Sequence, residues 1–231
     1  TVIPTSPAKQ SSRIVTDTGW LCTENTPAPI VDDLTTNITE MFRCAVTIEY
    51  TDNRIIVRSN GIPNHDFNSG IGCCATEQRY RWLIPRYPKI AQTATMAPDR
   101  GPIAITVTGI PIYGPEEGPG GDAVALHHEY FVEDRQPIEL GICGGHSGPG
   151  GTYHYHFDGN CIHWHPKNDG ESWTDWTPDK IDQTKHSRIL GYAFDGFPIY
   201  GPYGWDEDGS VIMLTSSYRL KETANGYNGI S

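Results

Sequence analysis

The chain has 231 residues, and its 17 basic and 28 acidic side chains give a formal charge of −11. This charge disfavours nucleic acid and anionic membrane surfaces as partners, because binding to either depends on Lys and Arg. The most apolar stretch, residues 101–112, is too short to cross a bilayer. We therefore expect a globular protein that binds neither nucleic acid nor membrane, and its 25 glycines and 18 prolines predict many turns.

The first segment, residues 1–13, is polar and has no hydrophobic periodicity, which predicts an N-terminal arm. The chain starts at Thr1, with neither Met nor a charged segment ahead of an apolar one, as expected if a signal peptide has been removed. The remaining residues, 14–231, are predicted to form one domain, since their number suits a single hydrophobic core.

Runs rich in Val, Ile, Thr and Tyr follow, separated by clusters of Gly, Pro, Asn and Asp, and this alternation is typical of antiparallel strands. The runs cover residues 44–50, 54–58, 79–84, 103–108, 130–132, 152–157, 189–193 and 211–215. Short helices are expected only at 32–41 and 179–185. The predicted fold is therefore mainly β: a single antiparallel β-rich domain with long Gly/Pro-rich loops, few short helices and disulfide staples.

A short motif is repeated along the chain. Residues 108–115 recur in similar form as 195–202, and residues 60–63 make a third partial copy. Each copy contains Gly, an apolar residue and Pro, a combination that turns the chain and continues it in an extended conformation. We interpret the motif as a reused turn and not as a domain duplication, because its spacing is far longer than that of solenoid repeats.

The cysteines indicate the cellular compartment in which the protein is expected to work. There are six, none of them in a C-x-x-C pair, so neither a thiolate zinc site nor a thioredoxin-like motif is supported. The even number, and the sequon that begins at Asn37, favour disulfides in an oxidising, extracellular compartment. The alternative is six buried thiols in a cytosolic protein. We expect a secreted protein that carries a glycan on Asn37 if its source is eukaryotic.

Five of the nine histidines fall within residues 143–165, and two of them lie in the run Tyr153-His154-Tyr155-His156. In an extended strand, residues two apart point to the same face. His154 and His156 can therefore reach one ion, while the two tyrosines face the other way.

A third ligand is available from His146, because the Gly-Pro-Gly-Gly run at 148–151 permits a tight return of the chain. Imidazole suits Cu²⁺ and Zn²⁺, so the sequence predicts a copper or zinc site made by His146, His154 and His156 with one open coordination position. The alternative is three histidines that form hydrogen bonds in a polar core or lie in solvent.

His163 and His165 repeat the same spacing and are followed by Pro166. They could form a second metal site or support the first one, or they could play no part in metal binding. His127 and His128 are adjacent and would face opposite sides of a strand, so we do not expect them to be ligands.

The cysteine pairing can be predicted in part. A bond between Cys143 and Cys161 would bracket the histidine-rich strand and keep its ligands in place. Cys73 and Cys74 are expected to have different partners, since adjacent residues rarely bridge. How they pair with Cys22 and Cys44 stays open.

Four blocks of the sequence resemble the YHYH domain family. They are Ser59-Asn-Gly-Ile-Pro-Asn-His65, Thr108-Gly-Ile-Pro-Ile112, Gly145-His146 with the Tyr153–His156 motif, and residues 189–201. The resemblance covers roughly residues 59–204 and excludes His163 and His165. It implies a secreted or cell-surface protein whose histidines are suspected metal ligands, and it implies no particular reaction.

The leading hypothesis is thus a secreted protein that binds copper or zinc through a histidine cluster. One alternative is a metalloenzyme, using either copper redox chemistry aided by a nearby Tyr or zinc-bound water with Asp158 or Asp195 as the base. Another alternative is an extracellular structural or matrix protein without catalysis. Its histidines would then contact mineral, polymer or further copies of the chain, so self-association and matrix partners are both expected under this alternative.

Overall fold

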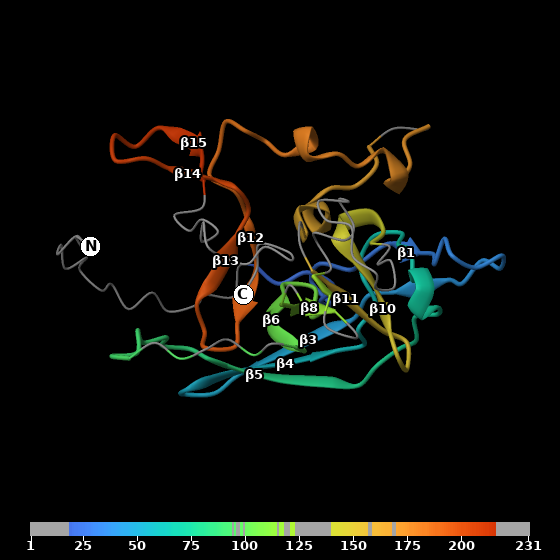
Figure 1. Cartoon of the computed structure of the whole chain (residues 1–231), viewed down its shortest axis with the longest axis horizontal. Helices are drawn as coiled ribbons and strands as arrows, with labels where there is room; N and C mark the ends of the chain where they lie inside the picture. The colour runs from blue at the N-terminus through green and yellow to red at the C-terminus, as the bar shows by residue number, and fades with distance from the viewer. Residues whose placement is uncertain are drawn as a thin grey trace.

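The structure is a computed structural model that describes residues 19–93, 95, 98, 100–114, 116–117, 121–122, 140–156, 159–167 and 170–215. The predicted arm at 1–13, the predicted strand at 130–132, His127, His128 and Asp158 lie outside these residues. The fold is mainly β, with several antiparallel sheets, and the described helices are all short 3-10 turns (Figure 1). The predicted fold class is confirmed.

The largest sheet has six strands in the order β10-β11-β7-β6-β12-β13. They are β6 (Pro102–Thr106), β7 (Pro111–Tyr113), β10 (Gly145–Gly148), β11 (Thr152–Tyr155), β12 (Ile189–Ala193) and β13 (Pro198–Tyr200). The sheet is antiparallel except between β11 and β7, which run parallel with Tyr155 opposite Ile112. Strand β7 therefore joins the β10–β11 hairpin to the rest of the sheet.

The repeated motif forms two hairpins in this sheet, β6–β7 and β12–β13, which are joined by antiparallel pairing of β6 with β12. The motif's glycine has a positive φ in each copy: 70° at Gly61, 77° at Gly109 and 95° at Gly196. Glycine adopts this conformation without the clash that a Cβ would cause. The motif is thus a tight turn that the chain uses three times.

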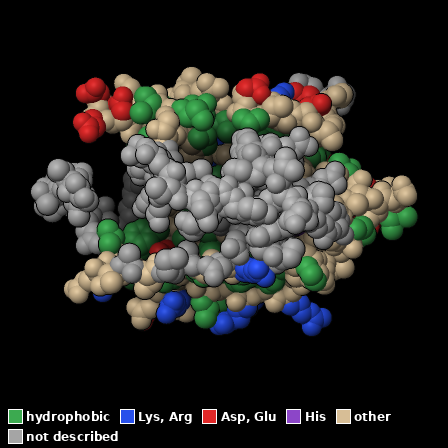
Figure 2. Space-filling view, viewed as in Figure 1, with side chains coloured by type: hydrophobic (Ala, Val, Ile, Leu, Met, Phe, Trp, Pro, Cys, Tyr) green, Lys and Arg blue, Asp and Glu red, His purple; other side chains and the backbone are tan. Residues whose placement is uncertain are grey.

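A second sheet contains β3 (Val46–Tyr50), β4 (Arg54–Ser59) and β5 (Tyr80–Pro85). Ile55 and Val57 are fully buried, whereas Arg58 is exposed and pairs with Glu49 at 3.1 Å. Arg58 also lies opposite Arg81 on β5. One face of this sheet therefore packs on the core and the other is basic; Lys and Arg side chains gather along the lower edge of Figure 2, where Figure 1 draws the sheet.

The remaining strands form three ribbons: β1 (Ile30–Val31) with β2 (Phe42–Arg43), β8 (Glu116–Glu117) with β9 (Gly121–Asp122), and β14 (Tyr203–Trp205) with β15 (Val211–Met213). The 3-10 helices are η1 (Gly70–Gly72), η2 (Ile142–Gly144), η3 (Gly159–His163), η4 (Trp173–Asp175) and η5 (Pro178–Lys180). In the described part of the chain, no helix has the length and apolar character that a membrane span needs.

Seven of the predicted strands coincide, to within a few residues, with β3, β4, β5, β6, β11, β12 and β15. The helix expected at 32–41 is wrong. The buried Asp33 carboxylate accepts hydrogen bonds from the Thr35 amide at 3.1 Å and from the Ser69 amide at 3.0 Å, which fixes a turn there instead. The helix expected at 179–185 is reduced to the single turn η5.

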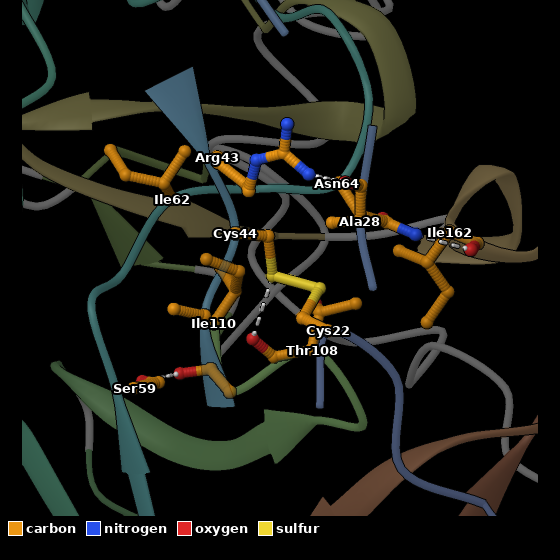
Figure 3. The surroundings of a disulfide bond; sticks show 12 residues. Cys22, Ala28, Arg43, Cys44, Ser59, Ile62, Asn64, Thr108, Ile110 and Ile162 are labelled. Carbon is orange, nitrogen blue, oxygen red and sulfur yellow. Dashed lines mark hydrogen bonds between the residues drawn. A yellow bond between two sulfur atoms is a disulfide. The ribbon is translucent and has the colours of Figure 1, made fainter. Parts of the chain in front are cut away.

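One hydrophobic cluster runs from Trp20 to Tyr192 and contains the Cys22–Cys44 disulfide, whose Cα atoms are 5.5 Å apart. Around this bond, the Arg43 guanidinium donates to the Ala28 carbonyl at 3.0 Å (Figure 3). The bond therefore fastens the segment before β1 to the start of β3.

Cys143 and Cys161 are bonded, as the sequence predicts, with Cα atoms 5.8 Å apart. The bond joins η2, which precedes β10, to η3. The side-chain amide of Asn64 donates a hydrogen bond to the Ile162 carbonyl at 2.9 Å, which also holds η3 in place (Figure 3). The histidine-rich hairpin is thus anchored at its base.

The prediction that Cys73 and Cys74 have different partners is wrong, because they are bonded to each other across a cis peptide bond. Cys22 and Cys44 lie together in the core, whereas Cys73 and Cys74 are exposed just after η1. The fold therefore leaves the two adjacent cysteines no partner but each other.

Candidate metal centre

The β10–β11 hairpin positions the three predicted ligands. Its tight turn contains Gly150 and Gly151, both with positive φ, and its register sets His146 directly opposite His154. The pairing continues one residue further, where the His156 amide donates to the Gly144 carbonyl at 2.9 Å. His146, His154 and His156 therefore share one face of the hairpin, as the alternation of strand residues predicts.

The two tyrosines of the motif face the opposite side and belong to the hydrophobic core. The Tyr153 ring packs edge-on against Phe67 at 4.9 Å, and the Tyr155 hydroxyl lies 2.7 Å from Nε2 of His65. Both tyrosines are almost completely buried. They anchor the back of the strand that carries His154 and His156.

The three histidines are buried and close together, with 6%, 2% and 8% of His146, His154 and His156 exposed. Their ring centroids are 4.6 to 5.3 Å apart, and one nitrogen from each ring lies within 4.8 Å of the others. The shortest separation is 3.3 Å, between Nε2 of His146 and Nε2 of His156. This triad could hold a metal ion.

Backbone contacts fix which nitrogen two of the rings present. Nδ1 of His154 donates to the Thr152 carbonyl at 3.0 Å, and Nδ1 of His156 donates to the Gly114 carbonyl at 2.9 Å. A carbonyl oxygen can only accept, so Nδ1 carries the proton in each ring and Nε2 of the neutral ring keeps the lone pair. Bonds of this kind hold metal-binding histidines in position in many proteins.

Tyr113, at the end of β7, is a neighbour that the sequence analysis did not identify. Its ring stacks on His154 with centroids 4.0 Å apart and an angle of 21° between the planes, and its edge meets His156 at 6.1 Å. The signal that could have revealed it is the repeated motif, in which Tyr113 directly precedes Gly114. The parallel pairing of β7 with β11 brings both residues to the triad.

Behind the triad's strand, His65 is fully buried. Its Nδ1 donates to the Asp66 carbonyl at 2.7 Å, so its Nε2 accepts the proton of the Tyr155 hydroxyl. Burial lowers the pKa of His65 to about 4 and raises the pKa of Tyr155 well above its ordinary value. Both side chains are therefore neutral at pH 7 and form a structural support.

The second histidine pair does not join the triad. Nε2 of His163 donates to the Ile189 carbonyl at 2.7 Å, and the His165 ring meets the edge of Trp173 at 5.2 Å. Burial lowers the pKa of both histidines. Neither residue belongs to a cluster of metal-ligating side chains within the described ranges.

The two proposed bases are not placed at the triad either. Asp195 is exposed in the β12–β13 turn, where its carboxylate accepts from the Phe197 amide at 3.3 Å. Strands β12 and β11 are three strand spacings apart, about 14 Å, so Asp195 is remote. Asp158 lies outside the described residues. Asn37 is exposed, and its glycan stays a prediction.

Two other groups of side chains have metal-ligand spacing among the described residues, but each contains bonded cysteines. His65 lies beside the Cys143–Cys161 bond, and Asp33 lies beside Cys73 and Cys74. Disulfide sulfurs are not thiolates and do not replace them as ligands. The triad is thus the described cluster best suited to a metal.

One comparison with known proteins matches the part of the chain that contains this hairpin. The sequence profile described as "YHYH protein" matches residues 81–230, which include the whole six-stranded sheet and the triad. Searches of curated proteins and of solved structures gave no match. Since the profile covers well over half of the 231 residues, the chain belongs to the YHYH protein family.

Proposed function

We propose that this protein binds one copper or zinc ion through His146, His154 and His156. The observation that carries the proposal is the convergence of three buried imidazoles on one face of the hairpin. Imidazole is a ligand that both metals favour. Burying three imidazole rings together costs free energy of desolvation, and metal binding would offset this cost.

The distances support a tetrahedral ion. Two nitrogens that each lie 2.0–2.1 Å from zinc in a tetrahedral site are about 3.3 Å apart. The Nε2 atoms of His146 and His156 have this separation, and a nitrogen of His154 lies within 4.8 Å of both, so its ring would have to move closer to complete the set. Three protein ligands would leave one coordination position for water, an anion or a substrate.

The same 3.3 Å distance also suits a hydrogen bond in the metal-free protein. Nε2 of His156 has the lone pair, so His146 can donate its Nε2 proton to it. Binding of an ion would displace this proton. The two states are therefore alternatives at the same atoms, and a metal titration distinguishes them.

We also propose that the protein works outside the cytosol. All six cysteines are paired and none is free, which is usual where the surroundings are oxidising. Mass spectrometry of native material tests this proposal: intact disulfides and a glycan on Asn37 would support it. Six alkylatable thiols would contradict it.

The metal proposal is tested by stripping the protein of metal and titrating it with CuSO₄ or ZnCl₂ in a calorimeter. We expect one ion per chain, and for copper an electron paramagnetic resonance spectrum with nitrogen hyperfine splitting. His146→Ala should weaken binding strongly. Tyr153→Phe, which alters the opposite face of the hairpin, is the matched control and should bind like the unmodified protein.

Two results would overturn the metal proposal. One is a folded protein that takes up neither ion with saturation. The other is His146→Ala binding as tightly as the Tyr153→Phe control. In either case the three imidazoles would be hydrogen-bonded members of the core.

A further inference from the structure

A cavity of about 410 Å³ lies between η3 and the segment that leads into β12. Its walls include His163, Trp164 and His165 from one side, and residues up to Arg188 from the other. It shares no lining residue with the histidine triad. The second His-x-His pair, which the metal site does not use, thus lines a separate cavity.

The described walls of this cavity are basic in an acidic protein. Four cations line it, namely Lys167, Lys180, Lys185 and Arg188, against the single carboxylate Asp182. The acidic residues Asp175 and Asp179 belong to the same segment but do not line the cavity. Positive charge is therefore concentrated on the cavity side of the segment.

Two of these cations already have carboxylate partners. Lys185 pairs with Asp182 at 2.9 Å, and Lys180 lies 3.9 Å from Glu171. Within the described part of the chain, no carboxylate forms an ion pair with Lys167 or Arg188, and both residues are exposed. These two side chains provide positive charge for an incoming anion.

The cavity also has an aromatic wall. The rings of Trp164 and Trp176 lie 5.9 Å apart, and the Lys180 ammonium lies 5.8 Å from the Trp164 ring. Trp176 is only half-buried, so part of its surface is available to a ligand. Hydrogen-bonding side chains of Asn160 and Ser187 line the same space.

We propose that this cavity binds an anionic saccharide, a short sugar chain that carries carboxylate or sulfate groups. A pyranose ring has a face of C–H groups that packs on an indole, and its hydroxyls bond to neutral polar side chains. Arg and Lys bind the acidic groups, Arg in a bidentate manner. The volume lies within the range of sites for ligands of about this size.

The two histidines add neutral polar groups to this site. Burial lowers the pKa of His163 and His165, so the lasting positive charge at neutral pH comes from Lys and Arg. The His163 ring is held by its bond to the Ile189 carbonyl, at the first residue of β12. The wall formed by η3 is therefore attached to the sheet and does not need to be ordered by the ligand.

Calorimetry with defined tetrasaccharides tests the proposal. Metal-stripped protein in chelator-free buffer is titrated with tetragalacturonate, which carries only carboxylates, with a sulfated carrageenan tetrasaccharide, which carries only sulfates, and with neutral cellotetraose. We expect saturable one-to-one binding of at least one acidic sugar, about 10-fold or more tighter than cellotetraose. The two acidic probes show which anionic group the site prefers.

The variants locate the site. Lys167→Gln with Arg188→Gln should weaken acidic-sugar binding by about 10-fold or more, since hydrogen bonds to charged groups are the strong ones. Trp176→Ala should weaken it too, through the lost stacking surface. The matched control is Arg54→Gln with Arg81→Gln, which removes two exposed charges from the β3–β5 sheet and should change nothing.

Three outcomes would overturn the proposal. The first two are that neither acidic tetrasaccharide binds, or that the sheet control weakens binding as much as the cavity variant does. The third is that ATP, which is also anionic and aromatic but is not a saccharide chain, binds more tightly than both acidic sugars. The exposed Gln substitutions keep the test informative even if Trp176→Ala fails to fold. The result is independent of the metal site, because the cavity and the triad have no residue in common.

Discussion

The chain contains two His-x-His pairs, and the fold uses them differently. His154 lies on β11, and the amide of His156 continues the same ladder by donating to Gly144. His163 instead ends the 3-10 helix η3, and His165 follows it. In a strand, residues two apart share a face, whereas each residue of a 3-10 helix is rotated by about 120° from the one before it. The first pair therefore converges on His146, whereas the second pair forms no such cluster among the described residues.

This difference shows that ligand spacing has meaning only together with backbone conformation. The first pair is preceded by a glycine-rich turn that returns the chain as a second strand, so a third histidine lies in register. The second pair is followed by Pro166 and has no partner strand among the described residues. His163 bonds to a backbone carbonyl, and His165 packs on Trp173.

The largest effect that tests this comparison is on metal affinity. Changing both His154 and His156 to Ala should reduce copper or zinc affinity by more than about 100-fold, since losing a partner outside the ligand set alone typically costs 10–100-fold. Changing both His163 and His165 to Ala should leave affinity unchanged. Calorimetric titration of the two metal-stripped double variants measures both.

Equal losses of metal affinity in the two double variants would contradict this distinction, because both histidine pairs would then contribute to metal binding. Far-UV circular dichroism of each variant shows whether the fold is intact. If the 163/165 variant keeps its metal affinity but loses acidic-sugar binding, the two pairs have separate tasks.

The next effect concerns the disulfide that joins the two regions. Cys143→Ala with Cys161→Ala should lower the free energy of unfolding by about 3 kcal/mol, because the bond closes a loop across a sequence separation of 18 residues. Metal affinity should also fall, since the base of the hairpin is no longer tied to η3. Denaturant unfolding of the metal-free protein measures the first quantity.

Cys73→Ala with Cys74→Ala is the control for this prediction. Its bond joins adjacent residues and closes no loop, so the entropy of the unfolded chain hardly changes. A stability loss as large as that of the Cys143/Cys161 variant would show that the exposed pair has a packing role that loop closure does not explain.

His65 lies in a third kind of histidine environment, and it should make the free energy of unfolding depend on pH. Its pKa is about 4 in the folded protein and 6.5 ordinarily, so between these values the unfolded chain takes up a proton that the folded chain excludes. The free energy of unfolding should therefore be highest above about pH 6.5 and fall by on the order of 3 kcal/mol as the pH drops to about 4. His163, whose pKa is also lowered, acts in the same direction.

Denaturant unfolding of metal-free protein at a series of pH values measures this slope. His65→Gln removes one of the titrating rings and should make the curve less steep between pH 6.5 and 4. An unchanged slope in that variant would assign the pH dependence to other groups.

Local sequence patterns predicted much of the site. Alternation along β11 and the glycines before it suffice to place His146, His154 and His156 together, because both signals act within one hairpin. Tyr113 could not be placed this way, since its contact with His154 depends on parallel pairing of strands about 40 residues apart. The helix expected at 32–41 failed for a similar reason: Asp33 bonds to Ser69, and this long-range contact overrides local preference.

The smallest predicted effect concerns Tyr113, which contacts the first pair's His154. The ring covers the His154 imidazole at 4.0 Å, so it restricts that ring's orientation. Tyr113→Leu should therefore weaken copper affinity by a few-fold to about 10-fold, at or below the usual effect of a residue that orients a ligand. Tyr113→Phe keeps the aromatic ring and should bind copper like the unmodified protein. Titration of both variants against copper decides whether stacking is the cause, and equal weakening in both would assign the effect to the hydroxyl instead of the ring.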